Sequence, residues 1–320
     1  MGSIFDFSYY NSKNEYLSKC LQWLNSPELG SLVKAFGSEI PQELALEQKL
    51  DWLCQFSERW DYRKKQSKTL DLKTGERARW MISDAGLSEE QKRSAMQVAS
   101  YLGMLESILP ARKFYDSVLV LGGARMSCLY RTRYARELLR KQIIEVGEVV
   151  GLTGMRPILE SERSATDTYA VNAATEFDLM CRATEQVFEF DVPHKVEQNF
   201  VSDANSAWAV AKYEGMLSAI VLAAPSSEPE HRRANTVDTF KFWIEKRGIQ
   251  KGKHLLLVTS QIYIPYQQLE AVRTLGLEYG CSVETIGFPR EWSDGVQGMQ
   301  TAENYLQEIR SVLQSMKRLM

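Results

Sequence analysis

Four short stretches of the sequence, each following an apolar run, carry the residue types that bind anions. They are Gly122-Gly123-Ala124-Arg125, Thr153-Gly154, Ser226-Ser227-Glu228 and Thr259-Ser260. Glycines and small hydroxylated residues let a backbone approach a ligand closely, and exposed amides favour negative charge there. Tight turns between strands and helices use the same residues, so one stretch alone is weak evidence. Four in succession predict a ligand site.

Basic residues beside these stretches predict that the ligand is an anion. Arg125, Arg131 and Arg133 lie at or just beyond the first stretch, and Arg233 lies beyond the third. A guanidinium group makes paired hydrogen bonds to phosphate or carboxylate. We expect Arg233, together with Arg125 or Arg131, to bind the ligand's charge. For any single arginine, a solvated helix face is the alternative.

The third stretch continues into the segment that is densest in charge. Asn235 or Thr236 is placed to cap the helix that follows, and both are also predicted to bind the ligand. Asp238 falls in the first turn of that helix, where the helix dipole favours negative charge. Capping does not explain why Glu228 precedes two adjacent arginines. We therefore predict Glu228 or Asp238 as a general base, with the arginines stabilising developing charge.

The fourth stretch is followed by Tyr263 and Tyr266, which flank a proline suited to the first turn of a helix. A tyrosine near the mouth of a site can stack on a base or a sugar, so Tyr263 joins the predicted ligand-binding residues. Packing against a neighbouring loop is the alternative use of such a side chain.

Several catalytic classes lack their sequence motifs. The chain has neither a complete G-x-G-x-x-G nor a P-loop, so neither a Rossmann dinucleotide enzyme nor a P-loop NTPase is predicted. His194, His231 and His254 are scattered, and we predict no metal site. No G-x-S-x-G occurs, although Ser227 lies close to His231 and leaves a serine nucleophile open.

The elements that position these residues alternate after Pro110. Short apolar runs at 117–121, 149–153, 219–223, 254–258 and 282–286 predict buried strands, and segments 131–146, 165–186, 204–216, 236–246, 265–275 and 302–319 predict helices. Such alternation predicts an α/β fold with a doubly wound, mainly parallel, Rossmann-like sheet. In such sheets ligands bind beyond the carboxyl ends of the strands, where all four stretches lie. Residues 188–200 cannot be assigned.

The chain before this pattern is predicted to be helical. Residues 1–110 show apolar residues at helical spacing and no convincing strand, so we divide the chain into a helical region, 1–110, and a Rossmann-like ligand-binding domain, 111–320. Trp23, Trp52, Trp60 and Trp80 lie in the helical region. Core packing is the first interpretation of these tryptophans, and binding of a protein partner is the alternative.

The composition indicates which classes of partner and which cell compartment to expect. The 320 residues include 39 basic and 41 acidic side chains, and a net charge of −2 argues against nucleic-acid binding through bulk charge. No apolar run is long enough to span a membrane, and the N-terminus does not resemble a secretory signal. The five cysteines are widely spaced, which favours free thiols and a cytoplasmic protein.

The ordered set of motifs resembles the DUF218 family, whose members include ElyC, SanA and YdcF, over about residues 115–290. It comprises 118–123 (VLVLGG), Arg131 or Arg133 with Ala135, Thr153-Gly154, Glu228 before 233–236 (RANT), and 258–260 (VTS). The resemblance implies a Rossmann-like domain whose ligand is S-adenosylmethionine, as described for one member, or a nucleotide. Tyr263 and Tyr266 stand where relatives have a histidine and an arginine.

Two functions remain open from the sequence. One is an enzyme, a transferase or hydrolase acting on a nucleotide-like or phosphorylated small molecule. The other is a non-catalytic sensor or interaction protein, whose C-terminal pocket binds a ligand while its N-terminal helices bind a partner. Only the enzyme would consume its ligand.

Overall fold

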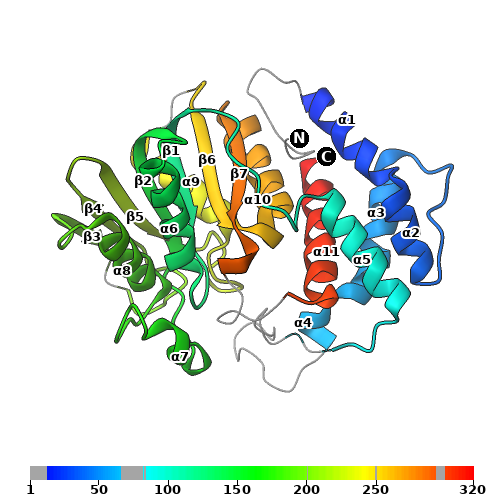
Figure 1. Ribbon diagram of the computed structural model, residues 1–320, viewed down its shortest axis with the longest axis horizontal. Coiled ribbons are helices and arrows are strands. Elements are labelled where there is room, and N and C mark those ends of the chain that lie inside the picture. Colours follow the sequence, from blue (N-terminus) through cyan, green and yellow to red (C-terminus); the bar gives the residue numbers. More distant parts are fainter. Residues whose placement is uncertain (1–12, 66–81, 83, 200, 249–250, 293–299) are drawn as a thin grey trace.

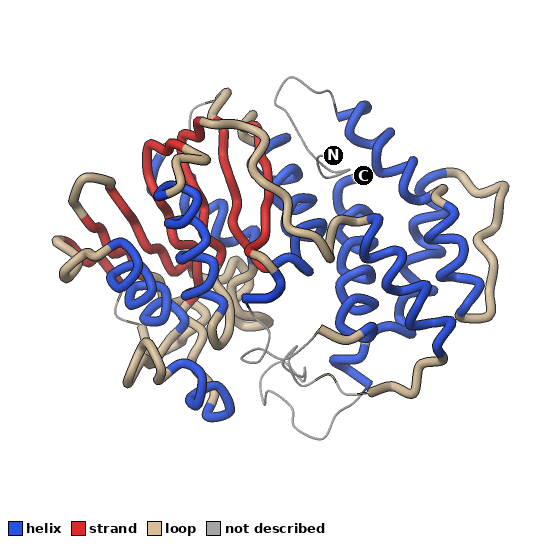
Figure 2. Tube along the Cα trace, in the orientation of Figure 1, coloured by secondary structure: helices blue, strands red, loops and turns tan. Residues whose placement is uncertain are grey.

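A seven-stranded sheet and a bundle of helices lie side by side in the computed structural model (Figure 1). The structure describes residues 13–65, 82, 84–199, 201–248, 251–292 and 300–320. Figure 2 shows that all strands lie in one half, whereas the other half contains helices and connecting loops. The predicted α/β class and the helical N-terminal region are confirmed.

The sheet has five neighbouring parallel strands and an antiparallel hairpin at one edge. Its strands are β1 (Phe114–Leu121), β2 (Glu145–Gly154), β3 (Lys195–Gln198), β4 (Ala209–Tyr213), β5 (Ser218–Ala224), β6 (His254–Ser260) and β7 (Ser282–Phe288), in the order β3-β4-β5-β2-β1-β6-β7. Strands β5, β2, β1, β6 and β7 pair in parallel, and β3 and β4 form the hairpin. The sheet is therefore mainly parallel, as predicted.

The central strands are apolar in their middle because both faces of the sheet are covered. In β1, Leu119 and Leu121 enter the core on one face, and Val118 and Val120 enter the core on the other. Successive side chains of a strand point to opposite faces. A strand covered on both sides therefore shows a continuous apolar run in the sequence.

Two pairs of helices cover the two faces of the sheet. Helices α6 (Ser127–Arg140) and α8 (Glu176–Phe188) pack on one face, and α9 (Thr236–Arg247) and α10 (Ile264–Ala271) pack on the other. A π-helical turn, Val272–Glu278, continues α10. This doubly wound arrangement leaves the loops after β1, β2, β5 and β6 along one edge of the sheet (Figure 1).

The C-terminal helix lies among the N-terminal helices. The bundle contains α1 (Lys13–Leu24), α2 (Pro27–Ala35), α3 (Leu46–Ser57), α4 (Tyr62–Lys65), α5 (Glu89–Tyr101) and α11 (Ala302–Leu319). Helix α11 packs on α3 and α5, and also on α10 beside the sheet (Figure 1). Arg310 of α11 pairs with Asp61 at 3.1 Å, and Arg318 contacts Glu270 of α10 at 2.5 Å. Helix α11 thus connects the bundle to the sheet.

Two predicted helices differ from the structure, and the unassigned stretch contains a strand. The helix predicted at 204–216 is wrong, because five of those residues form β4 and pair with β5. An apolar run this short does not distinguish a helix from a strand. The helix predicted at 165–186 divides into a short α7 (Arg163–Thr166) and α8, which begins after Thr175 because that side chain caps it. The unassigned stretch 188–200 contains β3.

The tryptophans with a described position belong mainly to the core. Trp23 and Trp60 are fully buried, which confirms the packing interpretation for both. Trp52 is partly buried and stacks on Phe56 with ring centroids 5.1 Å apart. Trp80 lies outside the described residues. Within the described chain, no helix is long and apolar enough to cross a bilayer.

Candidate functional site

The sheet has a topological switch point between β1 and β6. The chain leaves β1 into α6 on one face and leaves β6 toward α10 on the opposite face. Loops that diverge from adjacent parallel strands leave a crevice at the carboxyl ends, which is where open α/β sheets bind ligands. The first and fourth of the stretches predicted to bind an anion lie at this switch point.

Arg131 connects the two strands at the switch point. Its guanidinium, on a residue only 3% exposed, donates from Nη1 to the Leu121 carbonyl oxygen at 2.8 Å and also to the Gly122 carbonyl oxygen. Nε and Nη2 both donate to Ser260 Oγ, at 3.2 and 3.0 Å. Arg131 therefore places a positive charge in the crevice and holds the ends of β1 and β6 together.

The two glycines after β1 are required by close contacts. A Cβ on Gly122 would lie 2.5 Å from Glu176 Oε1 and 2.8 Å from the Leu152 carbonyl oxygen. A Cβ on Gly123 would lie 2.9 Å from the Ser127 Cβ atom. Helix α6 then begins with no side-chain cap and no acidic residue in its first turn. The backbone around this turn is thus close-packed, and the uncapped helix start favours an anion.

Arg125 adopts a left-handed backbone conformation, with φ of 54°. Its amide donates to Glu162 Oε1 at 3.2 Å, and its carbonyl oxygen accepts from the Tyr169 hydroxyl at 2.9 Å. A non-glycine residue in this region of backbone space costs roughly 1–2 kcal/mol. The two hydrogen bonds fix the turn at the start of α6 despite that cost.

A buried cluster of Arg156, Glu162 and Glu176 lies beside this turn, and we did not predict it. Arg156 pairs with Glu162 at 2.7 Å and with Glu176 at 3.1 Å. Burial raises the pKa of Glu162, but Arg156 and the amides of Leu159 and Arg125 outweigh it and hold this pKa below its usual value. The cluster brings together two residues of the connection that follows β2 and the first residue of α8, none of which carries a ligand motif. Only Glu176 could have been located from local sequence, because it directly follows Thr175, whose side chain caps α8.

The second stretch, Thr153-Gly154, has mainly a structural role. The Thr153 hydroxyl donates to the Leu222 carbonyl oxygen at 3.0 Å inside the sheet. A Cβ on Gly154 would lie 3.4 Å from the Ala234 Cβ atom. The loop after β5 therefore approaches the end of β2, which brings the second and third stretches together.

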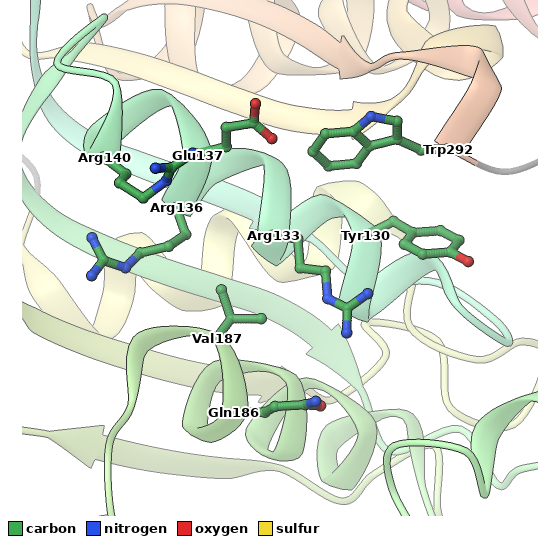
Figure 3. A pocket seen from close by; sticks show the side chains of 8 residues that line it. All are labelled: Tyr130, Arg133, Arg136, Glu137, Arg140, Gln186, Val187 and Trp292. Atoms are coloured by element: carbon green, nitrogen blue, oxygen red, sulfur yellow. The ribbon is translucent and has the colours of Figure 1, made fainter.

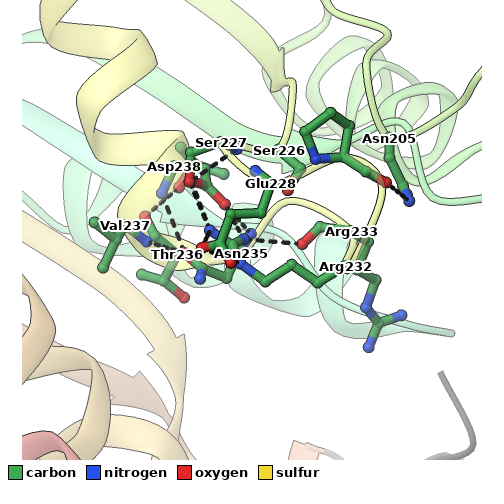
Figure 4. Close-up of polar contacts among 12 residues, drawn as sticks. Asn205, Ser226, Ser227, Glu228, Arg232, Arg233, Asn235, Thr236, Val237 and Asp238 are labelled. Atoms are coloured by element: carbon green, nitrogen blue, oxygen red, sulfur yellow. Dashed lines mark hydrogen bonds and ion pairs between the residues drawn. The ribbon is translucent and has the colours of Figure 1, made fainter.

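The third stretch forms a hydrogen-bonded network around Asp238 (Figure 4). Arg232 bridges Asp238 at 2.5 Å, Glu228 at 3.2 Å and Ser227 Oγ at 2.6 Å. The amides of Ser227 and Asn235 also donate to the Asp238 carboxylate, at 3.3 and 2.8 Å. Arg232, which the sequence analysis did not select, is therefore the centre of this loop.

The remaining residues of this loop cap its backbone. Ser226 Oγ accepts from the Glu228 amide at 3.0 Å. Asn235 is the N-cap of α9 and accepts from the amides of Val237 and Asp238, and Thr236 is the first residue of that helix. Capping by Asn235, one of the two predicted caps, is confirmed.

The contacts of Glu228 and Asp238 favour structural roles. Burial raises the pKa of Asp238, but Arg232 and the amide donors outweigh it, so this pKa lies below its usual value. Glu228 is exposed and pairs with Arg232. A carboxylate held in its ionised form by an arginine is a weak base. Their assignment as general bases remains a prediction.

The fourth stretch divides between the two faces of the sheet. Thr259 is fully buried, and its hydroxyl has no hydrogen-bond partner among the described residues. Ser260 faces Arg131 on the other side, and the Tyr263 ring lies 5.8 Å from the Arg131 guanidinium carbon. Tyr263 therefore packs beside the charged group at the crevice.

Two predicted arginines lie elsewhere. Arg133 is exposed on α6 and lines a surface pocket instead of the crevice. Arg233 is exposed and its side chain extends away from the network around Asp238 (Figure 4). The structure therefore gathers Gly122, Gly123, Arg125, Arg131, Ser260 and Tyr263 at the switch point.

Other chemistry at the crevice is restricted by burial. Burial raises the pKa of the Cys128 thiol to about 12, so this residue, whose Sγ lies 3.3 Å from the Gly123 carbonyl oxygen, is protonated at neutral pH. All five cysteines are free thiols. Among the described residues, no group of three or more histidine, cysteine, aspartate or glutamate side chains could hold a metal ion.

The fold and the crevice define a doubly wound, Rossmann-like α/β protein with a basic group at its switch point. The family model described as the Rv3785 N-terminal domain matches residues 9–103. The uncharacterised protein Rv3785 of Mycobacterium tuberculosis (strain ATCC 25618 / H37Rv) is 35% identical over 315 residues, covering 93% of this chain and 87% of the relative. The chain therefore belongs to the Rv3785 family.

Two further relatives show the same similarity. Uncharacterised protein MT3893 of M. tuberculosis (strain CDC 1551 / Oshkosh) and uncharacterised protein Mb3814 of Mycobacterium bovis (strain ATCC BAA-935 / AF2122/97) are also 35% identical over 315 residues. No solved structure matches the chain. The resemblance to the DUF218 family is wrong, because the family match is to Rv3785 instead. Motifs at strand ends follow from the sheet topology, so unrelated families share them.

Proposed function

We propose that the protein binds a small anionic molecule, carrying a phosphate or carboxylate group, at the switch point between β1 and β6. The observation that carries this proposal is the buried Arg131 guanidinium at the crevice, in contact with Ser260. A positive charge there, beside an uncapped helix start, favours a negatively charged ligand group.

The charges around the turn support an anion over a cation. Arg125, Arg131 and Arg156 carry three positive charges, and Glu162 and Glu176 carry two negative charges. Arg156 is engaged by both glutamates, and the buried Arg131 guanidinium adds a further positive charge beside the glycine turn. An anion placed there would gain charge-assisted hydrogen bonds, which are the stronger class.

Calorimetry with pyrophosphate and with inorganic phosphate tests the proposal. We expect saturable binding to the wild-type chain and about tenfold or greater weakening in Arg125→Gly, which removes the side chain in a backbone conformation that glycine prefers. Arg182→Ala, which removes an exposed arginine of α8 paired with Glu185, is the control and should bind like the wild type. Absence of saturable binding by either anion would exclude the proposal.

Glu176 supports an enzymatic version of the same proposal. Its Oε2 atom accepts from Arg156, whereas its Oε1 atom faces Gly122 at the crevice. A carboxylate oxygen there is placed to accept a hydrogen bond from a water or hydroxyl nucleophile and so to orient it, as a hydrolase or transferase requires. Loss of turnover of a phosphate ester in Glu176→Gln, with anion binding retained, would support this role. Equal turnover in the variant would exclude Glu176 from catalysis, and absence of turnover in the wild type would leave a binding protein.

A further inference from the structure

A surface pocket of about 520 Å³ lies over the outer side of α6 (Figure 3). It is lined by Tyr130, Arg133, Arg136, Glu137, Arg140, Gln186, Val187 and Trp292. Its size is that of a small-molecule site. Residues of an α-helix are about 100° apart around its axis, so Arg133, Arg136 and Arg140 lie about 140–200° from Arg131. The pocket is therefore distinct from the crevice at the switch point.

Three arginines supply the charge of this pocket. Arg133, Arg136 and Arg140 are spaced by three and four residues, so they share one side of the helix. Among the described residues, no carboxylate lies within ion-pair distance of any of the three. Like charges at these spacings repel each other. The helix dipole accounts for Arg140 in the last turn, but not for Arg133 near the middle.

The one carboxylate in the lining is already neutralised. Glu137 forms an ion pair with Lys141, one turn further along α6. The pocket therefore carries an excess of three positive charges, and the side chains of Arg133 and Arg136 point toward α8 (Figure 3). Such a set of forked donors suits the oxygens of a phosphate group.

An aromatic wall lies at the other end of the pocket. The Trp292 indole packs edge-on against Tyr134, with centroids 5.7 Å apart, and stacks on Phe288 at 6.5 Å. Tyr130, in turn, packs against Phe288 at 5.8 Å. These contacts fix the orientation of an indole that is itself partly exposed. An oriented indole beside three arginines suits a ligand with a flat ring next to its phosphate.

We propose that this pocket binds a phosphorylated small molecule with a planar ring, such as a nucleoside monophosphate, with the phosphate on the arginines of α6 and the ring against Trp292. Gln186 of α8 offers both a hydrogen-bond donor and an acceptor to the edge of the ring. The proposal is independent of the anion site at the switch point, because the two share no side chain.

Calorimetry with AMP, ribose 5-phosphate and adenosine tests each half of the pocket. We expect AMP to bind more tightly than ribose 5-phosphate, which lacks the base, and more tightly than adenosine, which lacks the phosphate. The double variant Arg136→Ala/Arg140→Ala should bind AMP about tenfold or more weakly, which is the loss expected when charge-assisted hydrogen bonds are removed. Trp292→Leu should remove most of the advantage of AMP over ribose 5-phosphate.

Two matched controls separate this pocket from the switch point. Arg182→Ala removes an exposed arginine of α8 outside the lining and should leave AMP binding unchanged. Arg125→Gly should weaken pyrophosphate binding but not AMP binding. The proposal is overturned if AMP shows no saturable binding at millimolar concentration, if the double arginine variant binds it like the wild type, or if Arg125→Gly abolishes it.

Discussion

Arg131 and Ser260 are joined by two hydrogen bonds to one oxygen atom, because Nε and Nη2 of the guanidinium both donate to Ser260 Oγ. The same guanidinium donates to the carbonyl oxygen of Leu121 at the end of β1. The pair therefore links the two strands whose connections diverge at the switch point. Arg131, which links the ends of β1 and β6, is therefore also the source of the positive charge at the switch point.

Ser260→Ala should destabilise the protein by about 1.5–3 kcal/mol, because it leaves a buried guanidinium without the acceptor of two hydrogen bonds. The free energy of unfolding in urea measures this loss. Ser311→Ala on α11 is the matched control, since that hydroxyl bonds only within its own helix and its loss should cost far less. Equal losses in the two variants would contradict the role of Ser260.

Arg125→Gly should stabilise the fold while it weakens anion binding. Glycine adopts a φ of 54° without strain, so we expect a gain of up to about 1 kcal/mol. Gln142→Gly, at a second residue with a φ of 54°, should give a similar gain and leave pyrophosphate affinity unchanged. Thermal unfolding and calorimetry on both variants check this. A loss of stability in Arg125→Gly would show that its side chain is needed for the turn.

Asp238→Asn should lower the free energy of unfolding at neutral pH and reduce its dependence on pH in acid. The pKa of Asp238 is lower in the folded state, because Arg232 and amide donors outweigh the effect of burial. Its stabilisation is thus fully present above the unfolded pKa of about 3.9 and is lost as the pH falls through the lower folded value. Urea unfolding between pH 2 and 7 should show that the free energy of unfolding falls less steeply with falling pH in the variant than in the wild type.

The control for this pH dependence is Asp167→Asn. Asp167 is exposed and lies 3.7 Å from Arg163, so its ion pair is weak. We expect the free energy of unfolding of Asp167→Asn to fall with decreasing pH as it does in the wild type. An unchanged pH dependence in Asp238→Asn would mean that the network around Arg232 contributes no pH-dependent stability.

Leu313→Ala should destabilise the bundle and the sheet together. Leu313 is fully buried in α11, which packs on α3, α5 and α10. Truncation of a buried leucine costs about 2–5 kcal/mol. Circular dichroism and tryptophan fluorescence should report one coincident transition at lower urea. Leu21→Ala, at a leucine 37% exposed on α1, should change little. Two separate transitions in Leu313→Ala would show that the bundle and sheet unfold independently.

The thiol of Cys128 should be inert in the folded protein. Burial raises its pKa to about 12, whereas Cys54 is only partly buried. We expect iodoacetamide at pH 8 to label Cys54 before Cys128, as read by mass spectrometry of peptides. Early labelling of Cys128 would show that the start of α6 opens readily.

The sequence predicted the strands and the edge where the four stretches lie, because buried parallel strands leave continuous apolar runs ending in small residues. It did not predict β4, whose five residues are too few for a reliable period. It also did not predict the cluster of Arg156, Glu162 and Glu176, which depends on tertiary contacts between the connection that follows β2 and the first residue of α8. Arg131 and Arg133 were indistinguishable in sequence, yet they point to opposite sides of α6.

The position of α11 has a consequence for the order of synthesis. The helices before residue 102 emerge from the ribosome before the sheet, but α11, which packs on α3, α5 and α10, is made after the last strand of the sheet. Until then the apolar faces of those early helices have no complete partner. The bundle therefore cannot finish folding until α11 has left the ribosome, after the whole sheet has been synthesised. Any exposed apolar face in that interval is a natural binding surface for chaperones.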